Sequence, residues 1–168
     1  MKNTDREIIY SEVQRFSWII NLIFIAVIII SFAAAAAALT AAGKSEEEPL
    51  EPGMMLFTII INLVLLALLV TFQMQTRVYK DAVWVRLLPF MPWFKKIPFE
   101  DIREYCPRKY RPVFEYGGWG IRYSFRNGKA YNAKGNKGLQ ITLKNGKKIL
   151  IGSQDPEKLA DAIKKHIN

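Results

Sequence analysis

Two long uncharged stretches constrain the fold of this chain more than any other feature. Residues 16–42 contain no charged side chain, and neither do residues 54–76. A helix rises about 1.5 Å per residue, so each stretch is long enough to cross the ~30 Å hydrocarbon core of a bilayer. The segment between them, 43–53, carries one lysine, Lys44, and four glutamates. The sequence therefore predicts a transmembrane helical hairpin, with helices at 16–42 and 54–76 and an acidic external loop at 43–53.

Basic residues near the ends of the two stretches predict the orientation of the hairpin. They are concentrated before the first stretch (Lys2, Arg6, Arg15) and after the second (Arg77, Lys80, Arg86). Lys and Arg are retained on the cytoplasmic side. We expect a two-pass protein of the cell membrane with both termini cytoplasmic, comprising an N-terminal segment at 1–15 and a domain at 72–168. A cleaved signal peptide is disfavoured, because the first stretch is much longer than a signal core of about 7–15 residues.

The positive charge of the chain lies in its C-terminal part. Residues 77–168 hold 20 Lys and Arg against 8 Asp and Glu, a formal charge of +12. An anionic cytoplasmic leaflet attracts such residues by about 1 kcal/mol each. Anionic lipid headgroups are therefore the expected partner, ahead of nucleic acid. The single cysteine, Cys106, excludes an intramolecular disulfide, and we expect it to be a small buried side chain.

Small and polar residues inside the two stretches predict how the helices pack. Ser31, Ala34, Ala35 and Ala38 have the small-xxx-small spacing that allows close approach of another helix. Asn62 lies in the second stretch at a comparable depth, and an amide in hydrocarbon needs a hydrogen-bond partner. We expect Asn62 to join the two helices and not to line an ion path.

After the second stretch the apolar period changes to two, which is typical of strands. Phe72, Met74, Thr76 and Val78 alternate with polar residues, and we expect six or seven short strands in all. Near residue 155, Asp155 and Pro156 are typical of the N-cap and first position of a helix. The apolar residues after them recur at helical spacing. This order predicts a barrel or sandwich closed by a C-terminal helix.

Two hairpins are expected at the Asn-Gly pairs of residues 127–128 and 145–146. A three-residue loop at 144–146, with Gly146 left-handed, pairs Ile141 with Ile149 and Leu139 with Ile151, which keeps apolar residues on shared faces. The same loop at 126–128 pairs Tyr123 with Tyr131.

The glycines around Trp119 could belong to a phosphate-binding loop or to β structure. A phosphate-binding loop follows a strand and opens a helix, whereas "GGWGIRYSF" leads into a strand. We therefore expect Gly117, Gly118 and Gly120 to adopt positive φ and form a bulge as the strand begins, with Trp119 over a core edge or at the membrane face.

The order of elements, together with "IPFEDI", "EYGGWGIRYSF" and the segment from "GKAYNAKG" to "KLADAI", resembles the bacterial pleckstrin-homology-like membrane proteins, in a two-span subgroup. The resemblance covers nearly the whole chain. It implies an α+β fold in which a transmembrane helical hairpin is followed by a pleckstrin-homology-like antiparallel β-barrel of seven strands, closed by a C-terminal α-helix. It implies no catalytic residues, and Ala82 stands where the family pattern has glycine.

The residues needed for catalysis or metal binding are sparse. One histidine, His166, and one cysteine cannot supply the usual ligands of zinc, and no base stands near a nucleophile in sequence. We expect no enzyme activity, no metal and no cofactor.

Two segments have the composition of binding sites. The first is "FMPWFKK", where Trp93 and Phe94 precede Lys95 and Lys96, which suits a lipid interface or, for the aromatic residues, the core. The second combines "RKYRP" and "KGNKG", with Trp119 as a neighbouring candidate. Its basic members form an anion site or a merely solvated surface: Arg108, Lys109, Arg111, Lys134 and Lys137.

These features favour a non-catalytic, membrane-anchored module that binds anionic lipid headgroups or a protein partner at the cytoplasmic face. The alternative is a structural subunit of a membrane complex, packed through the hairpin against another membrane protein or a second copy. A nucleic-acid binder that stacks bases on its aromatic residues is disfavoured by the membrane tether.

Overall fold

The computed structural model describes residues 7–15, 18–42 and 52–167. The chain divides into two compact units. One, the helical hairpin, is Phe16–Thr71. The other, which we call the sheet domain, combines Met1–Arg15 with Phe72–Asn168, so it is built from segments on both sides of the hairpin in sequence.

The helical hairpin consists of α1 (Trp18–Ala42) and α2 (Pro52–Thr71). Both are long and apolar enough to cross a membrane, over Asn21–Thr40 and Gly53–Thr71. Most of their large apolar side chains are exposed in the isolated chain, as expected of helices whose outer surface faces lipid.

The two helices are joined where their small and polar residues meet. Ser31 donates a hydrogen bond to Asn62 Oδ1 at 2.8 Å, and Asn62 is buried. Ala35 and Ala38 are half-buried on the same face of α1 as Ser31, whereas Ala34 is exposed on the outward side. The amide thus has the interhelical partner that its position in an apolar helix requires.

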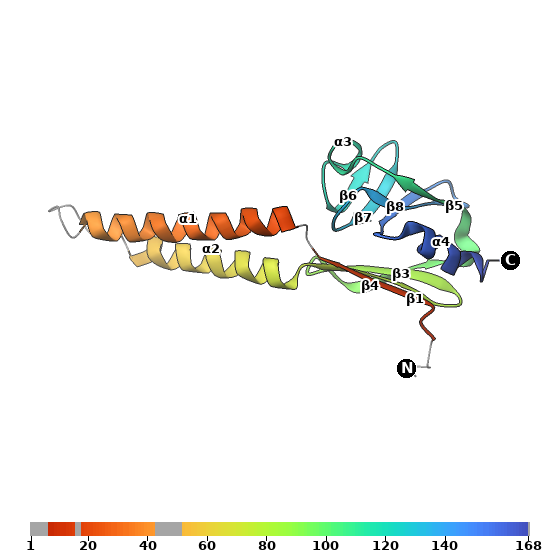
Figure 1. Ribbon diagram of the computed structural model, residues 1–168, viewed down its shortest axis with the longest axis horizontal. Helices are drawn as coiled ribbons and strands as arrows, with labels where there is room; N and C mark the ends of the chain where they lie inside the picture. The colour runs from red at the N-terminus through yellow and green to blue at the C-terminus, as the bar shows by residue number, and fades with distance from the viewer. Residues whose placement is uncertain (1–6, 16–17, 43–51, 168) are drawn as a thin grey trace. The chain divides into compact units, whose positions relative to one another are not determined.

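The sheet domain contains two sheets, and three short helical segments accompany the strands: a 3-10 turn η1, a short helix α3 and a closing helix α4 (Figure 1). The first sheet has the order β1-β2-β3-β4 and the second the order β5-β8-β9-β7-β6. The elements are β1 (Tyr10–Arg15), β2 (Gln73–Val78), β3 (Ala82–Leu88), β4 (Met91–Pro98), η1 (Phe99–Asp101), β5 (Ile102–Lys109), α3 (Pro112–Tyr116), β6 (Gly120–Ser124), β7 (Gly128–Asn132), β8 (Lys137–Leu143), β9 (Lys148–Gly152) and α4 (Pro156–Lys164).

Alternation of side chains places the core between the two sheets. In β2, Met74, Thr76 and Val78 are buried while the residues between them are partly exposed. The helix α4 packs against β2 of the first sheet and against β5 and β8 of the second, burying Leu159 and Ile163 (Figure 1). The expected apolar stripe of the C-terminal helix is therefore the element that closes the core.

The start of α4 is capped as expected. The Asp155 side chain accepts a hydrogen bond from the Lys158 amide, and Pro156 occupies the first turn. The pKa of Asp155 lies below its usual value, first because the Lys158 side chain donates to the carboxylate. Below its folded pKa the carboxylate becomes neutral, and its contribution to the helix start is lost.

The strand β1 was not expected from the sequence. It pairs antiparallel with β2, with Tyr10 opposite Val78 and Arg15 opposite Gln73. Its inner face is polar: Glu12 and Gln14 lie on the side of the buried core residues of β2. A polar inner face gives no apolar alternation, which is why the pattern of the sequence did not reveal it.

Four hydrogen bonds converge on the Glu12 carboxylate: two come from β1 itself, and two hold β1 to the residues directly after β9. Oε2 accepts from the Tyr10 hydroxyl at 2.7 Å and the Ser153 hydroxyl at 2.6 Å. Oε1 accepts from Gln14 Nε2 at 2.8 Å and the Gln154 amide at 2.7 Å. Gln14 Nε2 also donates to the Gly152 carbonyl. We call this set of contacts the Glu12 latch.

One predicted hairpin register is confirmed and the other is wrong. In β8 and β9, Ile141 pairs with Ile149 and Leu139 with Ile151, and Gly146 has φ +80°. In β6 and β7, however, Tyr131 pairs with Ile121 and not with Tyr123. The loop is displaced by one residue because Gly128 is already part of β7, where it lies directly against the Lys148 carbonyl.

The glycines near Trp119 have the expected positive φ, but the first of them has another role. Gly117, Gly118 and Gly120 have φ of +70°, +119° and +113°. Gly117 is the left-handed C-cap of α3, a helix that the sequence analysis missed. Gly120 then begins β6, so the segment does lead into a strand.

The predicted fold class is confirmed: the chain is α+β, with a hairpin of two apolar helices and sheets packed against a C-terminal helix. Three details differ. The described residues form nine strands in two sheets, not six or seven in one barrel, and β7 runs parallel to β9. Cys106 is exposed and not buried, because β5 is an edge strand whose outer face is open.

Candidate functional site

In the first predicted site, Phe94 and Lys96 lie on one face of β4, where both lie beside the Trp84 ring. Phe94 lies on the outer face of the first sheet, with the guanidinium groups of Arg77 and Arg86 5.1 Å and 4.5 Å from its ring centre. Trp93 is exposed. Lys95 and Lys96 lie further along β4, beside the cleft described below. Neither aromatic side chain fills the core.

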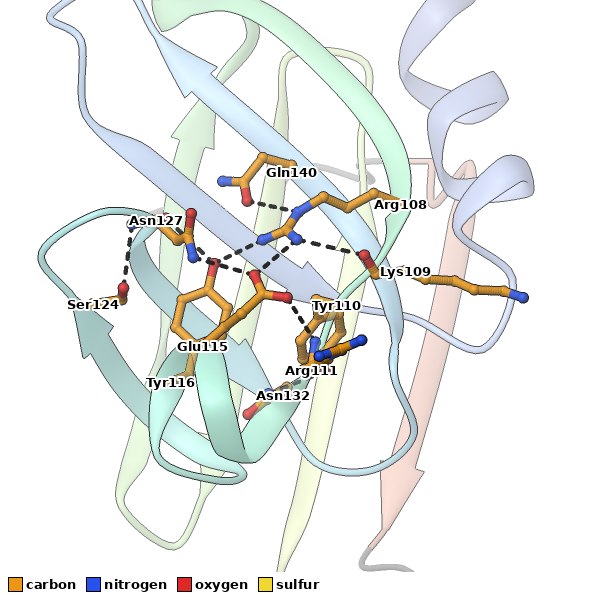
Figure 2. A network of polar contacts seen from close by, with 10 residues as sticks. All are labelled: Arg108, Lys109, Tyr110, Arg111, Glu115, Tyr116, Ser124, Asn127, Asn132 and Gln140. Carbon is orange, nitrogen blue, oxygen red and sulfur yellow. Dashed lines mark hydrogen bonds and ion pairs between the residues drawn. The ribbon is translucent and has the colours of Figure 1, made fainter.

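In the second predicted site, Arg108 is occupied by internal contacts (Figure 2). Its Nη1 donates to Glu115 Oε2 at 2.9 Å, its Nε to Gln140 Oε1 at 3.1 Å and its Nη2 to the Tyr116 hydroxyl at 3.2 Å. Glu115 also accepts from Asn127 Nδ2 and from the Arg111 amide. This half-buried network ties β5 to α3 and the β6–β7 hairpin, so the charge of Arg108 is already balanced.

The remaining members of that site lie around the network without forming a pocket with it. Lys109 is opposite Lys137 in the β5–β8 pairing, and its side chain points away from Glu115 (Figure 2). Trp119 Nε1 donates to the Gly135 carbonyl at 3.0 Å, which joins the loop before β6 to the loop that contains Lys134. Trp119 is half-buried and holds two loops together, and its expected place over a core edge or at the membrane face stays a prediction.

Two tyrosines beside the network remain protonated at physiological pH. Burial raises the pKa of Tyr110 to about 12, and its hydroxyl accepts from Asn132 Nδ2 at 3.0 Å. Burial also raises the pKa of Tyr116, although the nearby Arg108 opposes the shift. Both act as hydrogen-bonding groups of the fold and neither is poised as a base.

A cleft of about 840 Å³ opens elsewhere in the sheet domain, where three segments distant in sequence meet. One is the end of β4 with η1, the second is the β6–β7 hairpin and the third is the β8–β9 hairpin. Apolar side chains, including Ile97 and the buried Tyr131, form part of its lining. Its size lies within the range of about 300–1,000 Å³ that small-molecule sites occupy.

The side chains around this cleft are strongly basic. Six of them carry a positive charge: Lys95, Lys96, Arg126, Lys129, Lys147 and Lys148. Among the residues that line the cleft, all of which the structure describes, Asp101 is the sole acid. Lys96 forms an ion pair with Asp81 at 2.7 Å, and Lys129 lies 5.2 Å from the Tyr131 ring centre. We call this site the basic cleft.

Two exposed aromatic side chains flank the basic cleft. Tyr123 and Phe125 belong to the β6–β7 hairpin, and their rings meet edge to face at 5.7 Å. Phe125 is wholly exposed. An anion held by the lysines would therefore have an apolar surface beside it.

Only Lys95 and Lys96 of the basic cleft were among the predicted site residues. The sequence contains one signal for the others: each Asn-Gly turn is followed directly by lysine, as Lys129 and as Lys147 and Lys148. Both turns were recognised as hairpins. The tips of the two hairpins meet beside the end of β4 because β7 and β9 pair in parallel, and no local sequence pattern specifies that pairing.

Within 7–15, 18–42 and 52–167, no group of three or more His, Cys, Asp or Glu side chains is arranged to hold a metal ion. His166 lies at the end of α4, where its Nδ1 is 3.3 Å from the Ala162 carbonyl oxygen. The chemistry that this arrangement offers is the binding of an anion by positive charge.

The fold and the basic cleft define an α+β protein with two candidate membrane-spanning helices and a positively charged cleft. The chain belongs to DUF6141, a family of unknown function, which matches it over residues 1–168. A search of curated proteins finds no significant match.

Proposed function

We propose that this protein is a two-span membrane protein whose sheet domain binds the anionic headgroups of phospholipids in the basic cleft. The observation that carries the proposal is the convergence of six Lys and Arg side chains around a cleft with a single carboxylate. In this proposal the domain is a pleckstrin-homology-like module without catalytic activity. Two sheets closed by a C-terminal helix support that assignment.

The membrane arrangement rests on the hairpin and on β1. The outer surfaces of α1 and α2 are apolar, which suits a lipid environment. Because β1 pairs with β2, the segments before α1 and after α2 occupy the same side of the membrane. The basic residues of both segments favour the cytoplasmic side. The two ends of the chain are therefore cytoplasmic in this proposal.

The ligand chemistry follows from the charges of the cleft. Lys and Arg bind phosphate oxygens through charge-assisted hydrogen bonds. Each basic residue near an anionic leaflet is worth about 1 kcal/mol, so the cluster favours a lipid surface over bulk solvent. The exposed Phe125 ring beside the cleft suits a ligand that carries both a phosphate and an apolar part.

The test uses the full chain in neutral detergent micelles, because β1 belongs to the domain. Soluble dihexanoyl phosphatidylglycerol and dihexanoyl phosphatidylcholine are titrated by calorimetry into wild type and into a Lys147→Glu/Lys148→Glu variant. The matched control is Lys164→Glu/Lys165→Glu, which makes the same charge change on exposed residues of the C-terminal helix region, outside the cleft.

We expect wild type and the control to bind phosphatidylglycerol alike and to prefer it to phosphatidylcholine. The cleft variant should lose at least about tenfold in affinity, which corresponds to about 1.4 kcal/mol. Equal losses of affinity in both variants would show that lipid binding depends on net charge alone and not on the basic cleft. No binding by wild type would reject the headgroup site and favour a role as a subunit that packs through the hairpin.

A further inference from the structure

The turn between β3 and β4 and the first residues of β4 expose two large aromatic side chains next to buried ones. Phe90 is 62% exposed and Trp93 69%, whereas Met91 between them is 7% exposed. Phe72, which packs against Phe90, is 2% exposed. Large aromatic side chains that are left open on an otherwise packed edge commonly mark a surface that binds something apolar.

A bulge in β4 turns Trp93 outward. Val85 pairs with Lys95 and Leu87 with Met91, so Arg86 alone faces the three β4 residues 92–94. Arg86 holds this bulge in place. It donates to Gln75 Oε1 through Nε at 3.1 Å and Nη2 at 2.9 Å, and its guanidinium lies over the Phe94 ring. Bulges often serve to redirect a side chain in this way.

Chain connectivity places the turn at the end of the second helix. Phe72 directly follows Thr71, the last residue of α2 and of its candidate span. The ring centre of Phe90 is 6.4 Å from that of Phe72, and Gln73 pairs with Leu88. These contacts lie within the sheet domain, so they do not depend on the orientation of that domain relative to the helical hairpin. Phe90 therefore stays within a few ångströms of the residue that leaves the membrane span.

We propose that Phe90 and Trp93 form an interfacial seat, a surface that inserts into the boundary between lipid headgroups and acyl chains. Trp is enriched at this boundary because its ring is amphipathic, and apolar side chains there reach about 5–10 Å into the bilayer. The partner is lipid and not another protein, because Phe90 contacts Phe72, the residue that directly follows the candidate span. This inference rests on the membrane insertion of α2 proposed above, but not on ligand binding by the basic cleft.

The seat also explains how the basic cleft can reach the headgroup layer. Lys95 follows Phe90 by five residues along the chain. At about 3.3 Å per residue, it lies at most about 17 Å from Phe90. Phe90 and Trp93 would thus fix the depth of the strand whose other end lines the cleft.

The experiment measures the depth of single spin labels in the full chain, reconstituted in phosphatidylcholine vesicles. Cys106→Ser removes the one native cysteine. Labels are then placed by Phe90→Cys and by Trp93→Cys, and their collision rates with oxygen and with a soluble nickel chelate are compared. Leu63→Cys, on the exposed face of α2, reports the membrane core, and Lys80→Cys, in the turn at the opposite end of the first sheet, reports water.

We expect positions 90 and 93 to favour oxygen over the chelate several-fold more than position 80 does. Labels at 90 and 93 that are as open to the chelate as position 80, while position 63 is in lipid, would overturn the seat alone. A label at position 63 that is open to the chelate would reject membrane insertion itself. Phe90→Cys removes a ring contact, so a second measurement leaves Phe90 in place. The quenching of tryptophan fluorescence by lipids brominated near the headgroup is compared between wild type and Trp93→Phe. Equal quenching in these two proteins would likewise overturn the seat.

Discussion

Replacing Glu12 by alanine should release β1 from the sheet domain without unfolding the rest. The substitution removes all four hydrogen bonds of the Glu12 latch. Water can replace the carboxylate for the exposed Gln154 amide and the partly exposed Tyr10 hydroxyl. One bond is left, that from the buried Ser153 hydroxyl, because Gln14 belongs to β1 itself and keeps its bond to the Gly152 carbonyl. A hydrogen bond to a charged group contributes about 1.5–3 kcal/mol, so we expect a loss of about 2 kcal/mol.

Hydrogen exchange, followed by mass spectrometry on the full chain in micelles, measures this loss of stability in β1 directly. A tenfold change in an opening equilibrium corresponds to about 1.4 kcal/mol, so amides of β1 should exchange about 30-fold faster in the variant. Amides of β3, which has strands on both sides, should change much less.

The matched control is Glu7→Ala, which removes an ion pair to Lys80 in which both side chains are exposed. Exposed pairs contribute little to stability, so exchange in β1 should rise by less than about fivefold. The reasoning is refuted if Glu12→Ala leaves β1 as protected as in wild type. It is also refuted if β3 loses protection equally, since the effect would then be global.

Three further perturbations test separate features. Gly128 and Gly146 share a positive φ, but a Cβ at Gly128 would overlap the Lys148 carbonyl while Gly146 faces open space. Gly146→Ala should therefore cost about 1–2 kcal/mol, and Gly128→Ala should lower the thermal unfolding midpoint more than twice as far. The raised pKa of Tyr110 means that the unfolded chain loses this proton more readily, so stability should fall between pH 10 and about 12. At pH 11 the fall should be about 1 kcal/mol, and Tyr110→Phe should reduce this slope in alkaline unfolding curves. A double-mutant cycle of Ser31→Ala and Asn62→Ala, followed by unfolding in mixed micelles, should give a coupling of about 0.6 kcal/mol.

Each of these three predictions has a result that would contradict it. Equal thermal unfolding midpoints for the two glycine variants would mean that Gly128 in β7 packs less closely against Lys148 in β9 than described. A Tyr110→Phe variant with an unchanged alkaline slope would assign the slope to other groups. Zero coupling between Ser31 and Asn62 would mean that the amide finds equivalent partners elsewhere.

Local patterns were sufficient to predict the elements whose stabilising contacts are close in sequence. The apolar stretches specify α1 and α2, and the alternation in β2 specifies its buried face. The β8–β9 register follows from keeping Ile141 opposite Ile149, which a short loop permits. The cap at Asp155 follows from residues within one turn of the helix. In each case the energy that selects the structure comes from neighbours along the chain.

Features that depend on distant segments were missed. The strand β1 has a polar inner face, and Glu12 finds its partners only at Ser153 and Gln154. The β6–β7 register depends on how closely Gly128 approaches Lys148 in another strand. The basic cleft needs three segments together, so composition indicated an excess of positive charge but not where that charge converges.

The position of β1 ahead of the hairpin has a consequence for the order of events during synthesis. Gln14 and its acceptor Gly152 are separated by 138 residues. At about 5–20 residues per second, a ribosome needs roughly 7–28 s to pass from one to the other. During that interval both apolar helices and β2 emerge, while Glu12 and Gln14 still lack their partners at residues 152–154. If the two helices span a membrane as proposed, the sheet domain can be completed only when the first and last parts of the chain meet on one side of that membrane, so its assembly would report that both spans have been placed correctly.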